Sequence, residues 1–233
     1  VTDVFNSPQV SEDFNGVLFP PTGWKLEDSE GSSWEHDWPE GDDTDKVAGF
    51  PNYWVDAIGQ NHLLILPAVD FTNAEWANLS FDYSYSDNNN SFTDSLAFTY
   101  RTGSNSTWQT LWQKGGSTLD VAGTDVWYWY DENASINFDN AIVDLSFLAG
   151  ETCVEFAFAN IGAYGNHIWI DNVNLFGAFT GSDELTENIV VIHPNPSSGK
   201  YSLISNKEIT GIRIVDITGK VIKTINNPGK HVQ

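Results

Sequence analysis

The sequence predicts an all-β protein, a sandwich or jelly roll followed by a small second β module. Short segments alternate apolar and polar residues, as strands with one buried face do. Turns rich in Gly, Asn and Ser separate them, and little helical periodicity appears. The balance of charges changes sharply near residues 179–182, which divides the 233 residues into expected units 1–180 and 181–233.

The N-terminal part is expected to begin with an edge strand and a tight turn. Pro20 and Pro21, followed by Gly23, exclude a helix there. Residues 27–49 then form an acidic loop that is too long for a simple connection, so it is either functional or poorly ordered. Its acids could hold calcium, although acid clusters in loops are more often only solvated; they are Asp42, Asp43 and Asp45.

The middle of the chain contains the clearest strand signals. Residues 79–86 alternate without a fault, and residues 95–101 follow them after a polar turn. Cys153 is followed by Val154, Phe156 and Phe158 on one face of a further strand. The strands expected in this part, in order, are 62–67, 79–86, 95–101, 108–112 and 153–158, with an aromatic strand or loop at 126–130 and a short segment at 141–148.

A Gly-rich turn at 162–166 leads into the strand expected at 167–175. Trp169 and Val173 share one phase of the period-2 pattern, and Asp171 falls on that same phase. A carboxylate on an apolar face is unfavourable unless a charge or a hydrogen bond meets it. Asp171 is therefore expected either to bind Ca²⁺ or to be a buried, hydrogen-bonded acid.

The second unit is expected to contain strands at 189–193, 201–204, 209–216 and 221–225. Residues 194–199 form a turn, and residues 216–220 form a hairpin turn. No obvious last strand follows, so this module is expected to lack its C-terminal end.

Composition excludes several classes of function. Residues 1–180 hold 27 acids and 4 bases, whereas residues 181–233 hold 5 acids and 6 bases. Because the first unit is so acidic, we do not expect it to bind nucleic acid or an anionic membrane surface. It suits a secreted protein among divalent cations. The sequence has no run of about 18 apolar residues, so no membrane span is expected. Cys153 is the only cysteine, which excludes an intrachain disulfide.

The sequence shows no catalytic constellation. Neither an HExxH zinc helix nor a GxSxG elbow is present, and the five histidines have no ligand spacing. No pair of acids stands out for glycoside hydrolysis. The chain is therefore predicted not to be an enzyme.

Aromatic residues favour a binding function. The ten Trp residues exceed what one core needs, and exposed aromatic rings on a β-sandwich suit sugar rings or protein partners. The alternative for each residue is that it fills a thick core. The predicted ligand-binding residues are Trp54, Trp108, Trp127 and Trp129.

The first unit resembles choice-of-anchor J domains over about residues 12–176. The resemblance rests on Glu12 to Trp24, on Leu79-Ser80-Phe81-Asp82-Tyr83 and on Ile170-Asp171-Asn172-Val173. These domains are related to the cleaved adhesin domains of gingipains and, more loosely, to MAM-type jelly rolls. The resemblance implies a jelly-roll β-sandwich used for adhesion or substrate binding, in which structural calcium is common.

The same resemblance implies a calcium site. Glu12 and Asp171 are the acids carried over as ligands, Asp94 or Asn172 could contribute, and backbone carbonyls of 162–166 could complete the shell. The site would tie the N-terminal segment to the closing strand. Many relatives have Asp-Gly-Asp-Gly where this chain has residues 28–31, Asp-Ser-Glu-Gly, so no metal is carried over to that loop.

Residues 189–233 resemble the type A sorting domain of type IX secretion. The motif residues are Pro194, Asn195, Pro196, Gly199 and Gly219. The resemblance implies a Bacteroidota protein that the type IX machinery exports across the outer membrane, to be released or anchored at the cell surface.

Together these observations predict a secreted, non-catalytic adhesion module with a carbohydrate or protein ligand. The alternative is an accessory domain of a larger secreted hydrolase. Residues 94–96, 111–116 and 164–166 favour that alternative, because they resemble domains that follow pappalysin-like metalloproteases.

Overall fold

The predicted all-β class is confirmed. The computed structural model describes residues 10–28, 32–38, 45–87, 92–103, 106–121, 137–179, 190–193 and 202–232. In these ranges the regular structure is strand, apart from the short 3-10 turns η2 (Gly116–Thr118) and η3 (Ser146–Leu148). The aromatic strand or loop expected at 126–130 lies outside the described residues.

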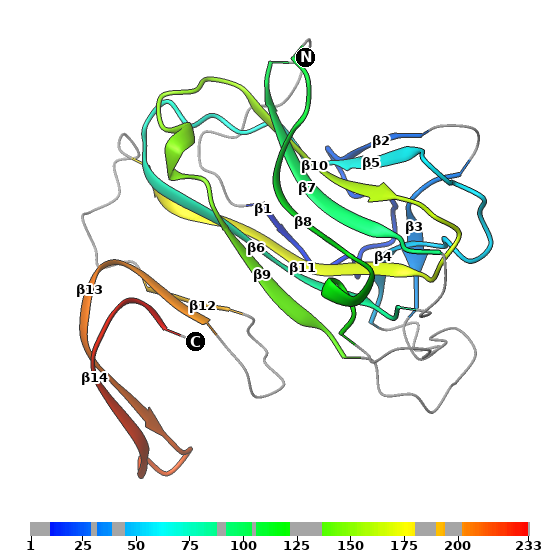
Figure 1. Cartoon of the computed structure of the whole chain (residues 1–233). Helices are drawn as coiled ribbons and strands as arrows, with labels where there is room; N and C mark the ends of the chain where they lie inside the picture. Colours follow the sequence, from blue (N-terminus) through cyan, green and yellow to red (C-terminus); the bar gives the residue numbers. More distant parts are fainter. Residues whose placement is uncertain are drawn as a thin grey trace.

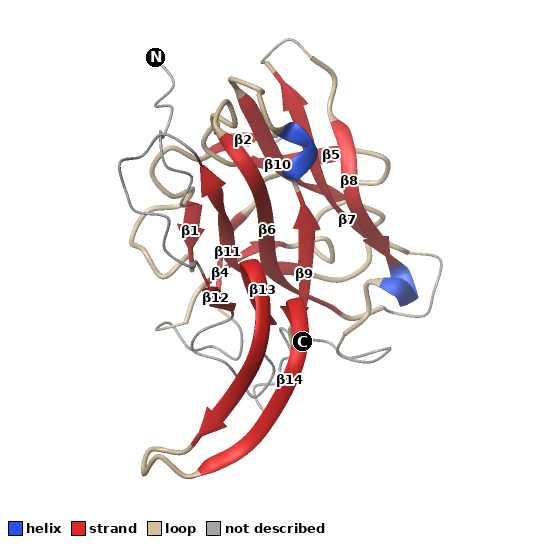
Figure 2. Cartoon of the chain, turned by 90° about the vertical axis from the view of Figure 1, so that its left-hand side faces the viewer, coloured by secondary structure: helices blue, strands red, loops and turns tan. Residues whose placement is uncertain are grey.

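Two sheets form a sandwich (Figures 1 and 2). The six-stranded sheet has the order β3-β4-β11-β6-β9, with β1 also paired to β11, and the five-stranded sheet has the order β2-β5-β10-β7-β8. Their strands are β1 (Val10–Glu12), β2 (Lys25–Glu27), β3 (Glu35–Asp37), β4 (Val47–Phe50), β5 (Asn61–Ile65), β6 (Ala74–Tyr85), β7 (Ser95–Thr102), β8 (Gln109–Gly115), β9 (Asp139–Asp144), β10 (Val154–Ile161) and β11 (Ile168–Phe179).

Aromatic side chains from both sheets fill the space between them. Phe81 of β6 meets Phe158 of β10 with ring centroids 4.9 Å apart, and Phe98 of β7 stacks on Phe156 at 5.5 Å. All four rings are fully buried. The alternation expected for 79–86, 95–101 and 153–158 is therefore confirmed, since its apolar phase is the phase that faces the core.

The N-terminal strand lies against the last strand of the sandwich, as expected. β1 pairs antiparallel with β11 in a register that places Glu12 opposite Val173. On its other side β11 pairs along most of its length with β6. The segment before the first turn is thus tied to the strand that closes the domain.

The phase predicted for β11 is wrong at Trp169 and Asp171. Asp171 lies opposite Asp82 and Asn174 lies opposite Ser80, so β11 carries one extra residue in this interval. This β-bulge contains Asn172, whose φ is +49°. It reverses the alternation, so the core contains Ile168 and Ile170 before the bulge but Val173 and Leu175 after it. Trp169 and Asp171 consequently face away from that core.

The C-terminal part forms a separate antiparallel sheet of β12 (Val190–His193), β13 (Ser202–Val215) and β14 (Val221–Val232). β13 joins the two segments expected at 201–204 and 209–216, and β14 extends beyond the expected residue 225. The hairpin turn forms around Asp216, whose Oδ1 accepts hydrogen bonds from the backbone N–H groups of Thr218 and Lys220. Gly219 adopts a φ of +87° in this turn.

Truncation of Phe98 should destabilise the sandwich strongly. Phe98→Ala removes a ring that contacts both Phe156 and Phe158, and the cavity left between the sheets should lower the free energy of unfolding by about 3–5 kcal/mol. Urea unfolding followed by Trp fluorescence measures this. The matched control is Phe147→Ala, because Phe147 is 58% exposed; a loss of similar size in both variants would contradict the assignment of the core.

Candidate functional site

Two carboxylates stand side by side on the outer face of the six-stranded sheet. Asp171 of β11 and Asp82 of β6 are cross-strand partners, and each is only 8% exposed. Like charges directly opposite each other destabilise a sheet. The bulge residue Asn172 bridges them, because its Nδ2 donates to Asp82 Oδ2 at 3.0 Å and to Asp171 Oδ2 at 3.1 Å. The Asn172 backbone N–H also donates to Asp171 Oδ1 at 2.7 Å.

The surroundings of Asp171 oppose its ionisation. Burial raises its pKa to about 8, and the negative charges of Asp45, Asp82 and Asp13 add to the rise. The hydrogen bond from the Asn172 N–H acts in the opposite direction but is outweighed. We refer to Asp13, Asp45, Asp82 and Asp171 as the acidic seam.

Four segments far apart in the sequence build the acidic seam. Asp13 directly follows β1, and Asp45 lies in the loop before β4. The backbone N–H of Lys46 donates to Asn15 Oδ1 at 2.8 Å, which joins these two segments. Asp13 and Asp82 were not predicted from the sequence as site residues. Asp82 lies on the polar phase of the alternation at 79–86, and only its pairing with Asp171 distinguishes it from the other polar residues of that strand.

Glu12 lies beside the acidic seam but is engaged in its own turn. Its Oε1 accepts a hydrogen bond from the Phe14 backbone N–H at 2.8 Å. Burial raises the pKa of Glu12, the N–H of Phe14 opposes that rise, and the charge of Asp13 adds to it. Glu12 and Asp171 thus lie on the paired strands β1 and β11, with Glu12 opposite Val173.

Asp94 has a different environment from the one predicted. Its carboxylate accepts hydrogen bonds from the backbone N–H groups of Ala163, Gly165 and Asn166 at 2.6, 3.2 and 2.8 Å, and from the Tyr85 hydroxyl at 3.2 Å. Burial nevertheless raises its pKa. The turn at 162–166 therefore presents donors to Asp94, and Asp94 serves as an anchor between the β6–β7 and β10–β11 loops.

The donor chemistry of the acidic seam fits a hard cation. Its side chains and the amide of Asn172 are oxygen donors of the kind that Ca²⁺ prefers, without a thiol or imidazole. Within the described ranges, no three acidic, His or Cys side chains converge closely enough to hold a metal as they lie.

A second buried polar cluster joins β3 to β11. Trp169 Nε1 donates to Asp37 Oδ2 at 2.6 Å, and His167 Nδ1 lies 3.3 Å from the same oxygen. Burial alone would raise the pKa of Asp37, but these two contacts lower it overall. Trp169, which the sequence placed in the core, instead fixes an acid on the outer face.

The predicted aromatic ligand-binding residues differ in their environments. Trp54, in the β4–β5 loop, is 66% exposed. Trp108 is half-buried, and the Arg101 guanidinium lies 4.3 Å from its ring centroid while it pairs with Glu155 at 2.7 Å. One face of the Trp108 ring is therefore already covered by a cation. Trp127 and Trp129 lie outside the described residues, as do Asp42 and Asp43 and the sorting-motif residues Pro194, Asn195, Pro196 and Gly199.

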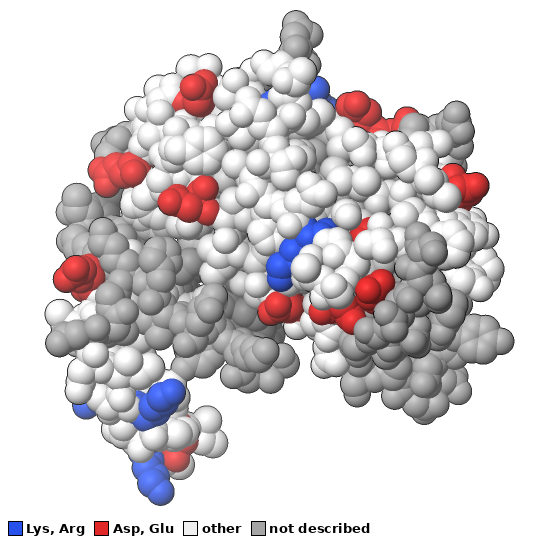
Figure 3. Space-filling model, in the orientation of Figure 1, with Lys and Arg blue, Asp and Glu red and all other residues white. Residues whose placement is uncertain are grey.

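Charge separates the two parts of the chain (Figure 3). Lys and Arg gather on the three-stranded sheet, whereas the face of the sandwich shown there carries mainly Asp and Glu. No helix in the described ranges is long and apolar enough to cross a membrane.

Comparison with protein families identifies the C-terminal part. Residues 191–233 match the family described as "Secretion system C-terminal sorting domain". This match supports the type IX sorting domain predicted from the sequence for residues 189–233. The predicted localisation is thereby confirmed: the protein is secreted or anchored at the cell surface. The comparison with curated proteins gives no match.

Comparison with solved structures identifies the fold of the first part. The K1 cleaved adhesin domain of Lys-gingipain from Porphyromonas gingivalis is 20% identical with a TM-score of 0.52, over 74% of this chain and 99% of that domain. The K3 cleaved adhesin domain of the same protein is 17% identical with a TM-score of 0.53, over 73% of this chain and 100% of that domain. The predicted jelly-roll β-sandwich is thus confirmed.

Stability without metal should depend on pH through Asp171. An acid with a folded pKa near 8 and an unfolded value near 3.8 binds its proton more tightly when folded. The contribution of Asp171 to the free energy of unfolding is therefore fully present at low pH. It is lost as pH rises from about 4 to 8, by at most about 1.4 kcal/mol per pH unit. In Asp171→Asn the free energy of unfolding should decrease less steeply with rising pH than in the wild type. At pH 8 in the presence of a chelator, this variant should be more stable than the wild type.

Urea unfolding between pH 5 and 8 in the presence of a chelator measures this slope. The matched control is Glu75→Gln, an exposed acid on β6, which should keep the wild-type slope. An identical slope in Asp171→Asn and wild type would contradict the role of the acidic seam.

Proposed function

We propose that this protein is a secreted or surface-exposed, non-catalytic binding module whose ligand is a carbohydrate or another surface protein. The observation that carries the proposal is a sorting domain joined in one chain to a sandwich with the cleaved adhesin fold. The two most buried histidines contact groups of the chain itself. His62 Nδ1 meets the Ser32 carbonyl oxygen at 3.0 Å, and His167 meets Asp37.

We further propose that the acidic seam binds Ca²⁺ as a structural ion. Asp171, Asp82, Asp13 and Asp45 would hold it, with Asn172 and Glu12 adjacent. A bound divalent cation would neutralise the buried carboxylates of Asp82 and Asp171, which otherwise repel each other, together with the exposed carboxylates of Asp13 and Asp45. It would tie β1 and the loop before β4 to the closing strand β11, so its role would be stability. The anchoring contacts of Asp94 favour leaving that residue out of the ligand set.

An accessory role remains the second candidate. The K1 and K3 domains are, by their descriptions, domains of a larger protein, Lys-gingipain. By analogy, the sandwich could position or stabilise a further domain of a longer secreted protein. The binding experiment below favours the first candidate if the chain binds a ligand by itself.

Calcium should raise the melting temperature of the wild-type protein. A ligand that binds only the folded state stabilises it, so millimolar CaCl₂ should raise the midpoint by several degrees relative to chelator. Differential scanning calorimetry measures the shift. Asp171→Asn should lose it and Glu75→Gln should retain it; an unchanged wild-type midpoint would remove calcium from the proposed function.

Binding itself can be tested with the full chain on a glycan array and on an array of bacterial and host surface proteins. The proposal expects saturable binding to at least one probe. Chelation should weaken that binding only to the extent that it unfolds the protein. Absence of binding to every probe, with the protein shown to be folded, would contradict the proposed function.

A further inference from the structure

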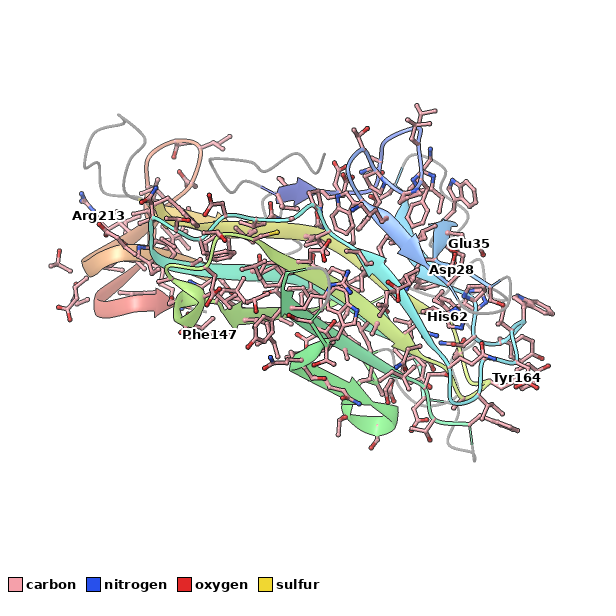
Figure 4. All side chains as sticks on the ribbon, turned by 90° about the horizontal axis from the view of Figure 1, so that it is seen from above. Asp28, Glu35, His62, Phe147, Tyr164 and Arg213 are labelled. Carbon is pink, nitrogen blue, oxygen red and sulfur yellow. The ribbon has the colours of Figure 1, made fainter. Side chains whose placement is uncertain are left out.

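One end of the sandwich exposes large apolar side chains from three different loops. Trp54 and Ile58 of the β4–β5 loop are 66% and 60% exposed. Phe92 of the β6–β7 loop and Tyr164 of the β10–β11 loop are 40% and 42% exposed, and their rings meet edge to face at 5.9 Å. We refer to Trp54, Ile58, Phe92 and Tyr164 as the aromatic loop end. Figure 4 shows Tyr164 and Phe147 at opposite ends of the sandwich.

The β6–β7 and β10–β11 loops are locked together below these rings. The Asp94 carboxylate accepts three backbone N–H groups of residues 163–166, as described above. Gly165 packs so tightly on Asp94 that no side chain fits at that position. Phe92 and Tyr164 are therefore carried by backbone that is already ordered.

The β4–β5 loop is fastened to the same structure. The Gly59 N–H donates to the Gly162 carbonyl at 3.2 Å, and a Cβ on Gly162 would approach Ala57 Cβ to 2.7 Å. Below them, the buried amides of Asn52 and Asn160 exchange reciprocal hydrogen bonds of 2.8 and 2.9 Å. Preordered exposed rings reduce the entropy lost on binding, which is the property of a binding surface.

The polar groups around the aromatic loop end decide the class of ligand. Residues 51–60, 92–94 and 162–166 contain no Lys or Arg, and Asp56 and Thr93 are exposed among them. With 27 acids against 4 bases in residues 1–180, a polyanion is repelled. A stable protein interface uses about 20–30 residues a side, far more than these four side chains. The apolar faces of uncharged sugar rings match aromatic rings flanked by carboxylate and hydroxyl groups.

We propose that the aromatic loop end binds a neutral polysaccharide, with Trp54 and Tyr164 stacking on its sugar rings. This inference rests on the proposed binding function and assigns its site and ligand class. The exposed carboxylate of Asp56 and the hydroxyl of Thr93 provide hydrogen-bonding groups for sugar hydroxyls.

Native gel electrophoresis in gels containing a soluble polysaccharide tests the proposal with the full chain, whose formal charge of −22 carries it through the gel. The neutral probes are xylan, mixed-linked β-glucan and galactomannan, and polygalacturonate is the anionic probe. At least one neutral polysaccharide should retard the wild-type protein, whereas polygalacturonate should not. Trp54→Ala and Tyr164→Ala should each weaken that retardation about tenfold or more, which corresponds to about 1.4 kcal/mol.

The matched control is Phe147→Ala, which removes an exposed ring from the opposite end and should bind as wild type. Thermal midpoints close to wild type would show that the variants are folded. Retardation that survives both substitutions, that is equally lost in Phe147→Ala, or that occurs only with polygalacturonate would overturn the proposal. A wild-type chain that binds a protein on the array but no neutral polysaccharide would overturn this inference and keep the proposed function. A chain that binds nothing overturns both.

Discussion

At Asn172 strand β11 carries one residue more than its partner β6, and the arrangement of the six-stranded sheet depends on that residue. Because of the bulge, β11 contributes both Ile170, which precedes it, and Val173, which follows it, to the same core. It also turns Asp171 outward beside Asp82. An Asn at this position suits the positive φ, because Asn tolerates the left-handed region better than most residues. A backbone irregularity, and not a core position, thus creates the buried pair of acids.

The buried acids Asp94 and Asp171 have the same side chain but different surroundings. Asp94 is surrounded by N–H donors, and these bonds hold the β6–β7 and β10–β11 loops together. Asp171 is surrounded by other carboxylates, so its burial is unfavourable until its charge is removed or neutralised. The first carboxylate is satisfied by donors of the chain itself, whereas the second is the one at which we propose a cation. This contrast is the physical basis for proposing calcium at one site and not at the other.

The chain forms no disulfide within itself, and its stability therefore depends on the aromatic core and on ties between distant segments. The pairing of β1 with β11 is one such tie, and the acidic seam lies at its end. The aromatic loop end uses a different set of ties, formed by Asp94 and by Gly162. The proposed cation site and the proposed ligand-binding surface thus use different ties within one sandwich.

The sequence by itself determined the strands, because the period-2 alternation at 79–86 and 95–101 follows from residue type alone. The sorting domain could also be recognised there, since its motif is local. The partners of Asp171 could not be foreseen. One inserted residue reverses which side chains face the core, and no local pattern marks the bulge at Asn172. Only the tertiary structure brings Asp13, Asp45 and Asp82 to Asp171 and unites three loops around Trp54 and Tyr164, because contacts between distant segments depend on strand order and register.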